Sequence, residues 1–367
     1  MKCRRISTLE EFEALAPLWA VVAREGGQAS PFLSHDWFGC CWRAAGPSRH
    51  PEALVIEDAM GPVGLVPLVR WEGRFRKVPV RFLGVLNAPD TPFVDWLVVG
   101  PPESVIEAVM AELADWPDWD VLTLRGVPAT SPTLKTLETW LPGRFRWQHG
   151  APIRSPHVVI SDLWETFWAA KSQRFKKTVR SVRNRLTKAG AVTIEEHRSA
   201  PAGSTVFEEL LEVSRRSWKA EHGLAIATMP RMPQFFRELT DLASANGWLR
   251  LWVLRLDGRA VATEYQIESD GCVHALRADF DSTLPMDLSP GAHLSCEILR
   301  ALFAREGVHE YDMGPGDNDY KSRLASDAHE TAHLLVFRPG AYGAALHALE
   351  TRAVPLWRRL RGDGGKS

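Results

Sequence analysis

The fold of this chain is decided by one stretch, SPGAHLSCEILRALFAREGVHEYDMGPGDNDYK, which covers residues 289–321. Ser289 is suited to cap a helix, and Pro290 suits its first turn. Gly291 adds no side chain there, so unpaired backbone N–H groups and the helix dipole favour an anion such as phosphate. Apolar residues then recur at helical spacing: Leu294, Ile298, Leu299, Leu302 and Phe303. The stretch predicts a helix with one face on a sheet and an open first turn.

A short strand and a polar loop follow this helix. Gly307 turns the chain, residues 310–313 form an apolar strand, and the Gly/Pro/Asp-rich loop returns Tyr320 and Lys321 towards the strand ends. A short helical crossover makes this strand parallel to its neighbour. We expect an extended cofactor where the two strands separate.

The strands before the helix are predicted from two turns. Asp257-Gly258 and Asp270-Gly271 each connect two strand-like runs, which is a strong hairpin signal. Three antiparallel strands therefore lead into the Ser289 helix. The sequence predicts an α/β fold with mixed, mostly antiparallel sheets flanked by helices.

The composition limits the classes of function. The 367 residues allow two domains, and 44 Lys plus Arg nearly balance 45 Asp plus Glu, so net charge does not indicate nucleic acid or membrane. No apolar run approaches the roughly 20 residues that span a bilayer, and no signal-peptide pattern is expected. Five cysteines without metal spacing favour a reducing cytoplasm. Twelve histidines without a ligand motif lead to no metal assignment. The sequence does not indicate an oligomeric state.

The domain junction is predicted between residues 126 and 156, where five prolines interrupt the pattern. We expect an N-terminal domain at 1–150 and a second domain at 151–340. Residues 341–367 then form a basic-ended helix and tail.

One helix of the second domain is strongly basic. Residues 171–188 contain eight Lys or Arg and no acidic residue, with apolar residues at three- and four-residue steps. Arg174 and Lys177 belong to this run. It is either a solvated face or a surface for a phosphate-bearing substrate, such as a nucleotide-sugar, CoA or the acceptor stem of tRNA.

Two acidic residues in predicted strands are candidates for chemistry. Asp312 ends an apolar strand, where an unpaired charge is costly, so it is expected to orient Lys321, bind the amine or pair with an Arg. Glu264 is predicted on the same strand face as Ala262 and Gln266, where its carboxylate could act as a base through water. Cys272 and His274 would share a face, but a core thiol is the stronger interpretation.

Several of these segments together resemble a known family. They are Ser289-Pro290-Gly291, the turn and strand 307–312, Gly316 with Tyr320-Lys321, the basic residues 174–177, and Trp218-Lys219. The set is similar to the acetyltransferase domain of bacterial proteins likened to CelD and BioF2, a branch of the GNAT superfamily related to the Fem aminoacyl transferases. The likeness covers residues 155–340 and, more loosely, 30–100.

The resemblance implies tandem GNAT-like domains, the first degenerate and the second catalytic. It implies an acyltransferase, an N-acetyltransferase above all, that moves an acyl group from acetyl-CoA or another acyl-CoA to an amine on a small molecule or a glycan or cell-envelope precursor. The alternatives are a Fem-like transferase that uses charged tRNA, and a non-catalytic partner in polysaccharide biosynthesis.

The resemblance also implies roles for particular residues. Tyr320 is the expected general acid, with Lys321, Asp312 and Glu264 as further catalytic candidates. The expected cofactor-binding residues are Ser289, Gly291, Ala292, His293 and Arg277. The expected substrate-binding residues are Arg174, Lys177, Trp218 and Lys219. The chain departs from the superfamily pattern because the phosphate-binding loop is reduced to one glycine.

Overall fold

The computed structural model describes residues 1–161, 163–201, 203–317 and 319–353. The chain forms two compact units. The first contains residues 1–88 and 93–153 and the described residues from Glu330 onward, and the second contains residues 89–92 and 154–329. The second unit is therefore shorter at its end than the domain 151–340 expected from the sequence, because the chain returns to the first unit at Glu330.

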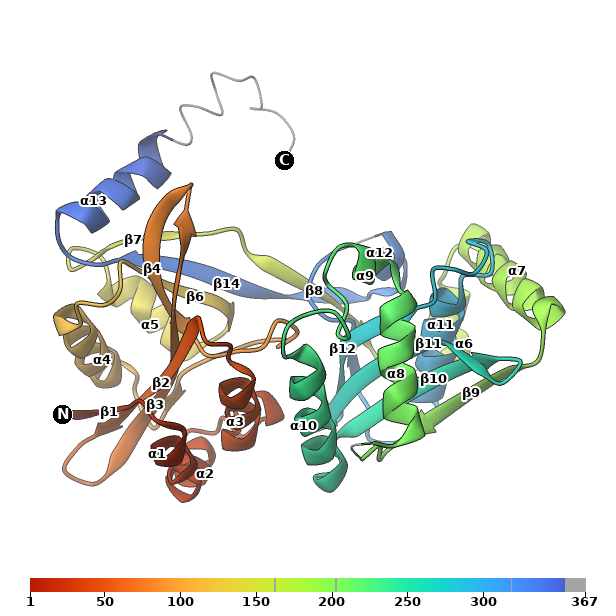
Figure 1. The fold of residues 1–367 in the computed structure, drawn as a ribbon, viewed down its shortest axis with the longest axis horizontal. Coiled ribbons are helices and arrows are strands. Elements are labelled where there is room, and N and C mark those ends of the chain that lie inside the picture. The colour runs from red at the N-terminus through yellow and green to blue at the C-terminus, as the bar shows by residue number, and fades with distance from the viewer. Residues whose placement is uncertain (162, 202, 318, 354–367) are drawn as a thin grey trace. The chain divides into compact units, whose positions relative to one another are not determined.

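The first unit is a mixed sheet with helices (Figure 1). Its strands lie in the order β1-β2-β3-β4-β6-β14, with β5 on β3 and β7 on β14. Among the described residues of this unit, only β4 and β6 are paired in parallel, through Phe82–Gly84 and Val121–Thr123, because helix α4 lies in the connection between them. The elements are β1 (Lys2–Ile6), α1 (Leu9–Glu13), α2 (Ala16–Glu25), η1 (Pro31–Leu33), α3 (His35–Ala44), β2 (Arg49–Glu57), β3 (Pro62–Phe75), β4 (Val78–Val85), β5 (Leu97–Val98), α4 (Glu103–Asp115), β6 (Val121–Pro128), α5 (Pro132–Trp140), β7 (Arg146–His149), β14 (Asp327–Phe337), α13 (Ala341–Ala348) and η2 (Leu349–Ala353).

The second unit repeats this plan with a sheet in the order β8-β13-β12-β11-β10-β9. The pairing is antiparallel except between β12 and β13. Its elements are β8 (Ile153–Val159), α6 (Trp164–Ala169), α7 (Gln173–Ala189), β9 (Val192–His197), α8 (Thr205–Arg216), α9 (Trp218–Glu221), α10 (Met232–Ala245), β10 (Leu249–Leu256), β11 (Arg259–Ser269), β12 (Cys272–Phe280), α11 (Pro290–Phe303), β13 (Glu310–Asp312) and α12 (Asp319–Leu324).

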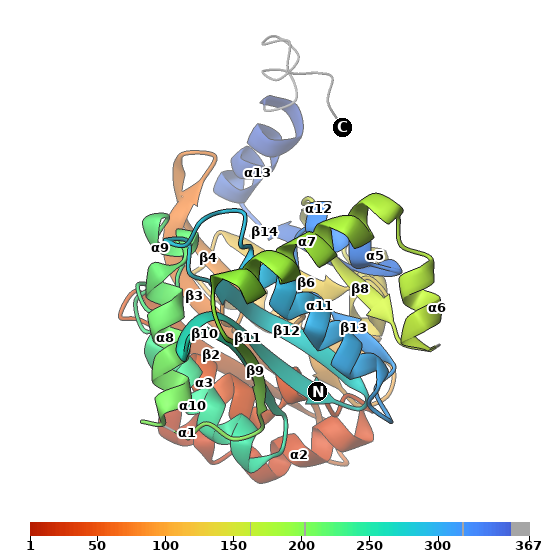
Figure 2. The ribbon, with the colours of Figure 1, turned by 90° about the vertical axis from the view of Figure 1, so that its right-hand side faces the viewer.

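Helix α11 is the predicted Ser289 helix, and it covers one face of this sheet. It contacts β10, β11 and β12, with α7 packed on it (Figure 2). Leu294, Ile298, Leu299 and Leu302 are at most 2 % exposed, which confirms the apolar face. Helices α8 and α10 cover the sheet beside Phe236 and Tyr265, on its other face. The sheet is thus buried between two helical layers.

The strands separate where the sequence predicted it. β12 and β13 pair in parallel only from Cys272–Glu310 to His274–Asp312. Beyond His274, β12 continues to Phe280 along β11 alone, within the described residues. The register of β11 with β12 also shifts between Tyr265 and Gln266, which leaves Leu276 as the extra residue of a bulge. Because a bulge bends a strand and increases its twist, it separates β12 further from β13.

The boundary between Ile153 and Arg154 that separates the two units lies within residues 126–156, which also contain α5, β7 and the start of β8. Helix α8 ends at Arg216 and α9 begins at Trp218, because the backbone of Ser217 between them is extended. The predicted tail helix is present to Ala353, and the rest of the 341–367 tail lies outside the described residues. No described helix is both long and apolar enough to cross a membrane.

Candidate active site

A cavity of about 970 Å³ opens at the separation of β12 and β13 in the second unit. Four segments line it: β12 from Ala275 with the turn that follows to Ser282, the start of α11 from Ser289 to Ala292, residues 313–315 after β13, and Tyr320 and Lys321 on α12. Glu264 and Tyr311 line it from the sheet, and Trp218 and Lys219 from α9. Most of the residues that the sequence singled out therefore meet in one cavity.

The first turn of α11 is open to this cavity. Ser289 was expected to cap the helix, and this is wrong, because its hydroxyl donates to the Met286 carbonyl at 2.9 Å and its φ is 42°. No described side chain caps the helix in its place. A Cβ at Gly291 would lie 3.0 Å from Cδ1 of Phe280, so glycine allows this turn to pack closely on β12. The unpaired amides of the turn remain suited to an anion.

Glu264 is the buried carboxylate of the cavity. It is 2 % exposed. Its carboxylate accepts from the Tyr311 hydroxyl and from Gln266 Nε2 at 2.7 Å, and Ser295 Oγ on α11 lies at 3.4 Å. The contact with Gln266 confirms the predicted shared face. Burial raises the pKa of Glu264, while its hydrogen-bond donors act in the opposite direction.

Tyr320 and Lys321 lie on α12, which follows β13. The Tyr320 hydroxyl interacts with Cys296 and Ser295, and burial raises its pKa, so the phenol is neutral and able to donate a proton. Lys321 donates to the carbonyl oxygens of Gly314, Pro315 and Gly316 at 2.8, 3.1 and 3.0 Å. Burial lowers the pKa of Lys321. Its ammonium therefore holds the loop that borders the cavity.

Asp312 contacts Gly314 and His274, whereas the sequence led us to expect Lys321, the amine or an Arg as its partner. One carboxylate oxygen accepts from the Gly314 amide at 2.8 Å, and the other lies 3.2 Å from His274 Nδ1. Asp312 thus fixes the turn after β13. The Cys272 thiol donates to Glu310 at 3.3 Å, and His274 contacts Asp312, so the two side chains of the possible Cys272–His274 pair have other partners in the described chain.

Arg277 and Asp279 lie near the end of β12, and each binds a different partner. Arg277 Nη2 lies 2.8 Å from Asp90, and Lys219 Nζ lies 2.8 Å from Asp279. Lys219 also donates to the Ala278 carbonyl at 2.6 Å. Arg277 and Asp279 share the sheet face of Tyr265 and Thr263, opposite to the face of Glu264. The ionic network therefore lies on the cavity wall away from α11.

Trp218 is the apolar candidate at this wall. It is 44 % exposed and lines the cavity, with its ring edge against His222. Its surface is therefore available to a ligand.

Four candidates lie outside the cavity. Within the described residues, the lining does not include Asp312, His293, Arg174 or Lys177. His293 is buried behind the first turn of α11, and burial lowers its pKa. Arg174 and Lys177 are exposed on α7.

Three partners that organise the site were not singled out by the sequence. Tyr311 and Ser295 contact Glu264, and Asp90 holds Arg277 from 187 residues away in the sequence. Strand alternation placed only Gln266 on the face of Glu264. The other three contacts depend on tertiary structure.

The comparisons with known proteins agree with this geometry. Residues 173–322 match the family model described as the acetyltransferase (GNAT) domain. The matched residues include β12, α11, β13, Glu264 and Tyr320. A search of curated proteins finds no match.

Solved structures with the same fold cover nearly the whole chain. FemX is 12 % identical with a TM-score of 0.55, over 95 % of this chain and 99 % of that chain. A tandem GNAT protein from the clavulanic acid biosynthesis pathway is 12 % identical with a TM-score of 0.54, over 93 % and 100 %. L-PGS from Bacillus licheniformis is 11 % identical with a TM-score of 0.54, over 95 % and 97 %. The chain therefore has the tandem GNAT-like α/β fold expected from its sequence.

Proposed function

We propose that the second unit transfers an acyl group from acyl-CoA, with acetyl-CoA as the first choice, to an amine. The observation that supports this most is one cavity that joins a strand separation, an uncapped helix start and a buried carboxylate. The first unit is then a degenerate copy of the fold. We propose the limits 1–150 for the degenerate domain and 151–340 for the catalytic domain, followed by the tail 341–367.

The donor fits the α11 side of the cavity. The pyrophosphate would bind the amides between Ser289 and Ala292, with His293 behind them. Arg277 lies on the opposite wall of the cavity and would contact the donor from there. The small side chains Ala275 and Ala278 lie opposite Gln266 and Glu264, so this part of β12 leaves room for a thioester. Its backbone would donate hydrogen bonds to the thioester oxygen.

The reaction follows from the groups that meet there. The amine nitrogen attacks the thioester carbonyl carbon, a C–N bond forms, and negative charge develops on the carbonyl oxygen. Glu264 accepts the proton that the nitrogen loses, directly or through water. The C–S bond then breaks, and the thiolate takes a proton from the Tyr320 hydroxyl. Lys321 and Asp312 act by holding the loop after β13 beside the thioester.

The acceptor would enter from the wall formed by α9 and the ionic side of β12. Trp218 offers an exposed apolar surface, and Lys219 and Asp279 lie beside it. A ring with polar substituents suits this combination, so an amino sugar or a cell-envelope precursor of the kind handled by CelD-like and BioF2-like proteins is the proposed acceptor. All five cysteines are free, which agrees with a cytoplasmic reaction.

A charged tRNA is the second candidate donor, and the exposed face of α7 favours it. Arg174, Lys177, Arg180, Arg183 and Lys188 are all exposed on this helix. The face is therefore free to contact a phosphate backbone.

Thermal unfolding with each donor separates these possibilities. A ligand at 100 times its Kd stabilises the native state by about 2.7 kcal/mol. We expect acetyl-CoA to raise the Tm and uncharged or charged tRNA to leave it unchanged. A shift with tRNA alone would replace CoA by tRNA as donor, and no shift with either would favour a non-catalytic role in polysaccharide biosynthesis.

A further inference from the structure

A second group of titratable side chains lies on the sheet face opposite to α11. Val158, Val273 and Tyr311 belong to the core that contains the buried face of α11. Their neighbours in the strands point the other way, and the register places His157, Asp312 and His274 in one row across β8, β13 and β12. Glu310 and Cys272 form the next row on that face, because each lies two residues before Asp312 and His274.

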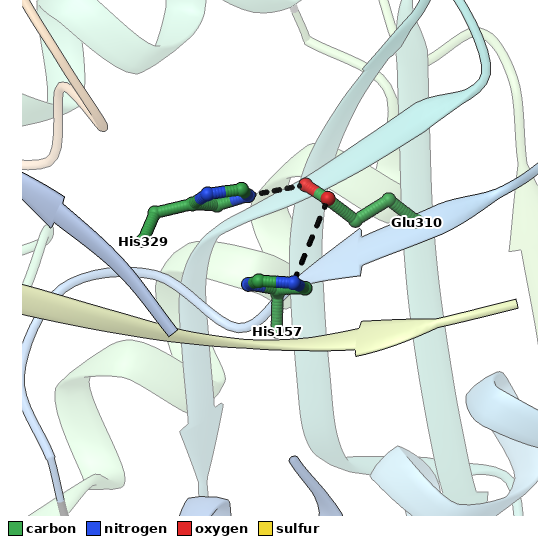
Figure 3. A group of neighbouring side chains, drawn as sticks. All are labelled: His157, Glu310 and His329. Carbon is green, nitrogen blue, oxygen red and sulfur yellow. Dashed lines mark hydrogen bonds and ion pairs between the residues drawn. The ribbon is translucent and has the colours of Figure 1, made fainter. Parts of the chain in front are cut away.

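Three of the side chains in this region converge on one point, as Figure 3 shows. His329, from the first residues of β14, places Nε2 at 2.8 Å from Glu310 Oε1. His157 places Nε2 at 3.8 Å from the other oxygen, Oε2. The two imidazoles stack with centroids 4.0 Å apart, at 15°. One donor atom from each of the three residues lies within 4.8 Å of the other two.

Two imidazoles and one carboxylate form a recognised set of metal ligands. Zn²⁺ takes nitrogen and carboxylate oxygen at about 2.0–2.2 Å, and a tetrahedral arrangement places such donors roughly 3.4 Å apart. Small side-chain rotations would bring the three donors to that spacing. Mg²⁺ and Ca²⁺ prefer oxygen ligands alone, so this set favours a transition metal.

The surroundings of Glu310 suit a ligand carboxylate. The Cys272 thiol donates to Glu310 Oε1 at 3.3 Å, as an outer partner that orients the carboxylate or as a fourth donor. His157 is 6 % exposed, and its Nδ1 is buried without a hydrogen-bond partner in the described chain. The side chain of His329 is 50 % exposed, which leaves an entry path for an ion.

We propose that His157, Glu310 and His329 bind a divalent transition-metal ion, with Zn²⁺ as the first choice. The metal would connect β8, β13 and the start of β14 beside the short parallel pairing of β12 and β13. It would therefore hold β13 in place next to the point where β12 and β13 separate. The three ligands are 153 and 19 residues apart in the sequence, so no spacing motif marks them.

Titration of the metal-stripped full chain with Co²⁺ tests this proposal, in protein purified without a polyhistidine tag. We expect one equivalent of Co²⁺ to give the visible absorption of a tetrahedral site, and Zn²⁺ to displace it. His329→Ala should raise the Kd at least about tenfold to a hundredfold, since loss of a ligand costs no less than loss of an outer partner. Because the side chain of His329 is half-exposed, we expect this variant to fold.

His149→Ala is the matched control. The side chain of His149 is 52 % exposed and lies 3.4 Å from Glu138, but within the described residues it belongs to no group of three such donors. Its Kd for Co²⁺ should equal that of the unmodified chain. Glu310→Gln, which keeps the shape of the side chain, should weaken binding as His329→Ala does.

The proposal is overturned if the unmodified chain shows no saturable site for one equivalent of Co²⁺ or Zn²⁺. It is equally overturned if His329→Ala and Glu310→Gln bind with unchanged affinity. Either result would leave the three side chains as a hydrogen-bonded cluster. The measurement reads metal affinity alone, so its outcome is independent of the proposed acyl transfer.

Discussion

Replacement of Glu264 by Gln removes the proposed base while preserving the shape of its site. The new side-chain oxygen can accept from Tyr311 and from Gln266 Nε2, as Oε1 does now at 2.7 Å from the latter. The new amide then faces Ser295 Oγ, which lies 3.4 Å from Oε2 and can accept a hydrogen bond. Glu264→Gln therefore changes the capacity to accept a proton and little else.

The expected loss of activity follows from this. General-base catalysis contributes about 10²–10⁴ in rate, so kcat should fall by that factor, equivalent to roughly 2.7–5.4 kcal/mol of activation free energy. The KM for acetyl-CoA should stay the same, since Glu264 is proposed to act on the amine. In the unmodified protein, kcat should fall as pH decreases through the raised pKa of Glu264, because the base must be ionised. The rate of CoA release, measured with a thiol reagent at several pH values and acetyl-CoA concentrations, checks kcat, KM and the pH dependence.

The same variant should gain stability at neutral pH. Burial raises the folded-state pKa of Glu264 above its ordinary value of 4.5. The native state then holds a proton that the unfolded chain has lost, so stability falls as pH rises from about 4.5 to the folded pKa and stays lower above it. Gln does not ionise. The Tm of Glu264→Gln should exceed that of the unmodified chain at pH 7, and the difference should disappear below the ordinary pKa.

Glu52→Gln is the control for this pair of effects. Glu52 and Glu264 are both 2 % exposed strand residues, but Glu52 lies 2.6 Å from Arg5 and 2.7 Å from Arg70. Its neutralisation removes the buried charge that Arg5 and Arg70 share, and among the described residues Arg70 then keeps only Asp118 as an ion-pair partner, at 3.6 Å, so the Tm should fall. An unchanged kcat in Glu264→Gln would refute the assignment of the base. A lower Tm at pH 7 would refute the stated effect of burial.

Three further changes test other parts of the site. Tyr320→Phe should lower kcat by at least about tenfold with unchanged donor affinity, in steady-state kinetics, and an unchanged kcat would remove Tyr320 from the mechanism. Gly314→Ala should lower the Tm by at least several degrees. A φ of 77° costs a non-glycine residue about 1–2 kcal/mol, and the new Cβ would lie 2.7 Å from the Ala275 carbonyl oxygen. A Tm equal to that of the unmodified chain would contradict this. Charge reversal at Arg174 and Lys177 should leave the KM for acetyl-CoA and its salt dependence unchanged, and a salt-sensitive increase in KM would place the donor on α7.

The sequence predicted the features that local patterns determine. Helical periodicity located α11, the Asp-Gly turns located the hairpins, and strand alternation placed Glu264 beside Gln266. The separation of β12 from β13 followed from a short crossover. These predictions succeeded because neighbouring residues in the sequence decide helix faces, tight turns and strand faces.

The sequence could not predict the contacts that depend on distant segments. Arg277 pairs with Asp90, and His157, Glu310 and His329 meet only when three strands come together. The prediction that Ser289 caps helix α11 was also wrong because it left out the neighbouring segment. A Ser-Pro pair favours a capped helix start, but the preceding turn holds this residue at a φ of 42° and takes its hydroxyl for the Met286 carbonyl.

The bulge at Leu276 decides which side chains β12 places on each side of the cavity. In a regular strand, His274, Leu276 and Ala278 would share a face, and Ala275 would share the other with Arg277. The extra residue reverses this order, so Ala278 lies beside Glu264 on the α11 face and Arg277 lies opposite Tyr265 on the other. Small side chains thereby face the α11 side of the cavity, and Arg277 and Asp279 lie on the other side of β12. The proposed chemistry of the site thus depends on an irregularity of strand pairing that no single residue type in the sequence indicates.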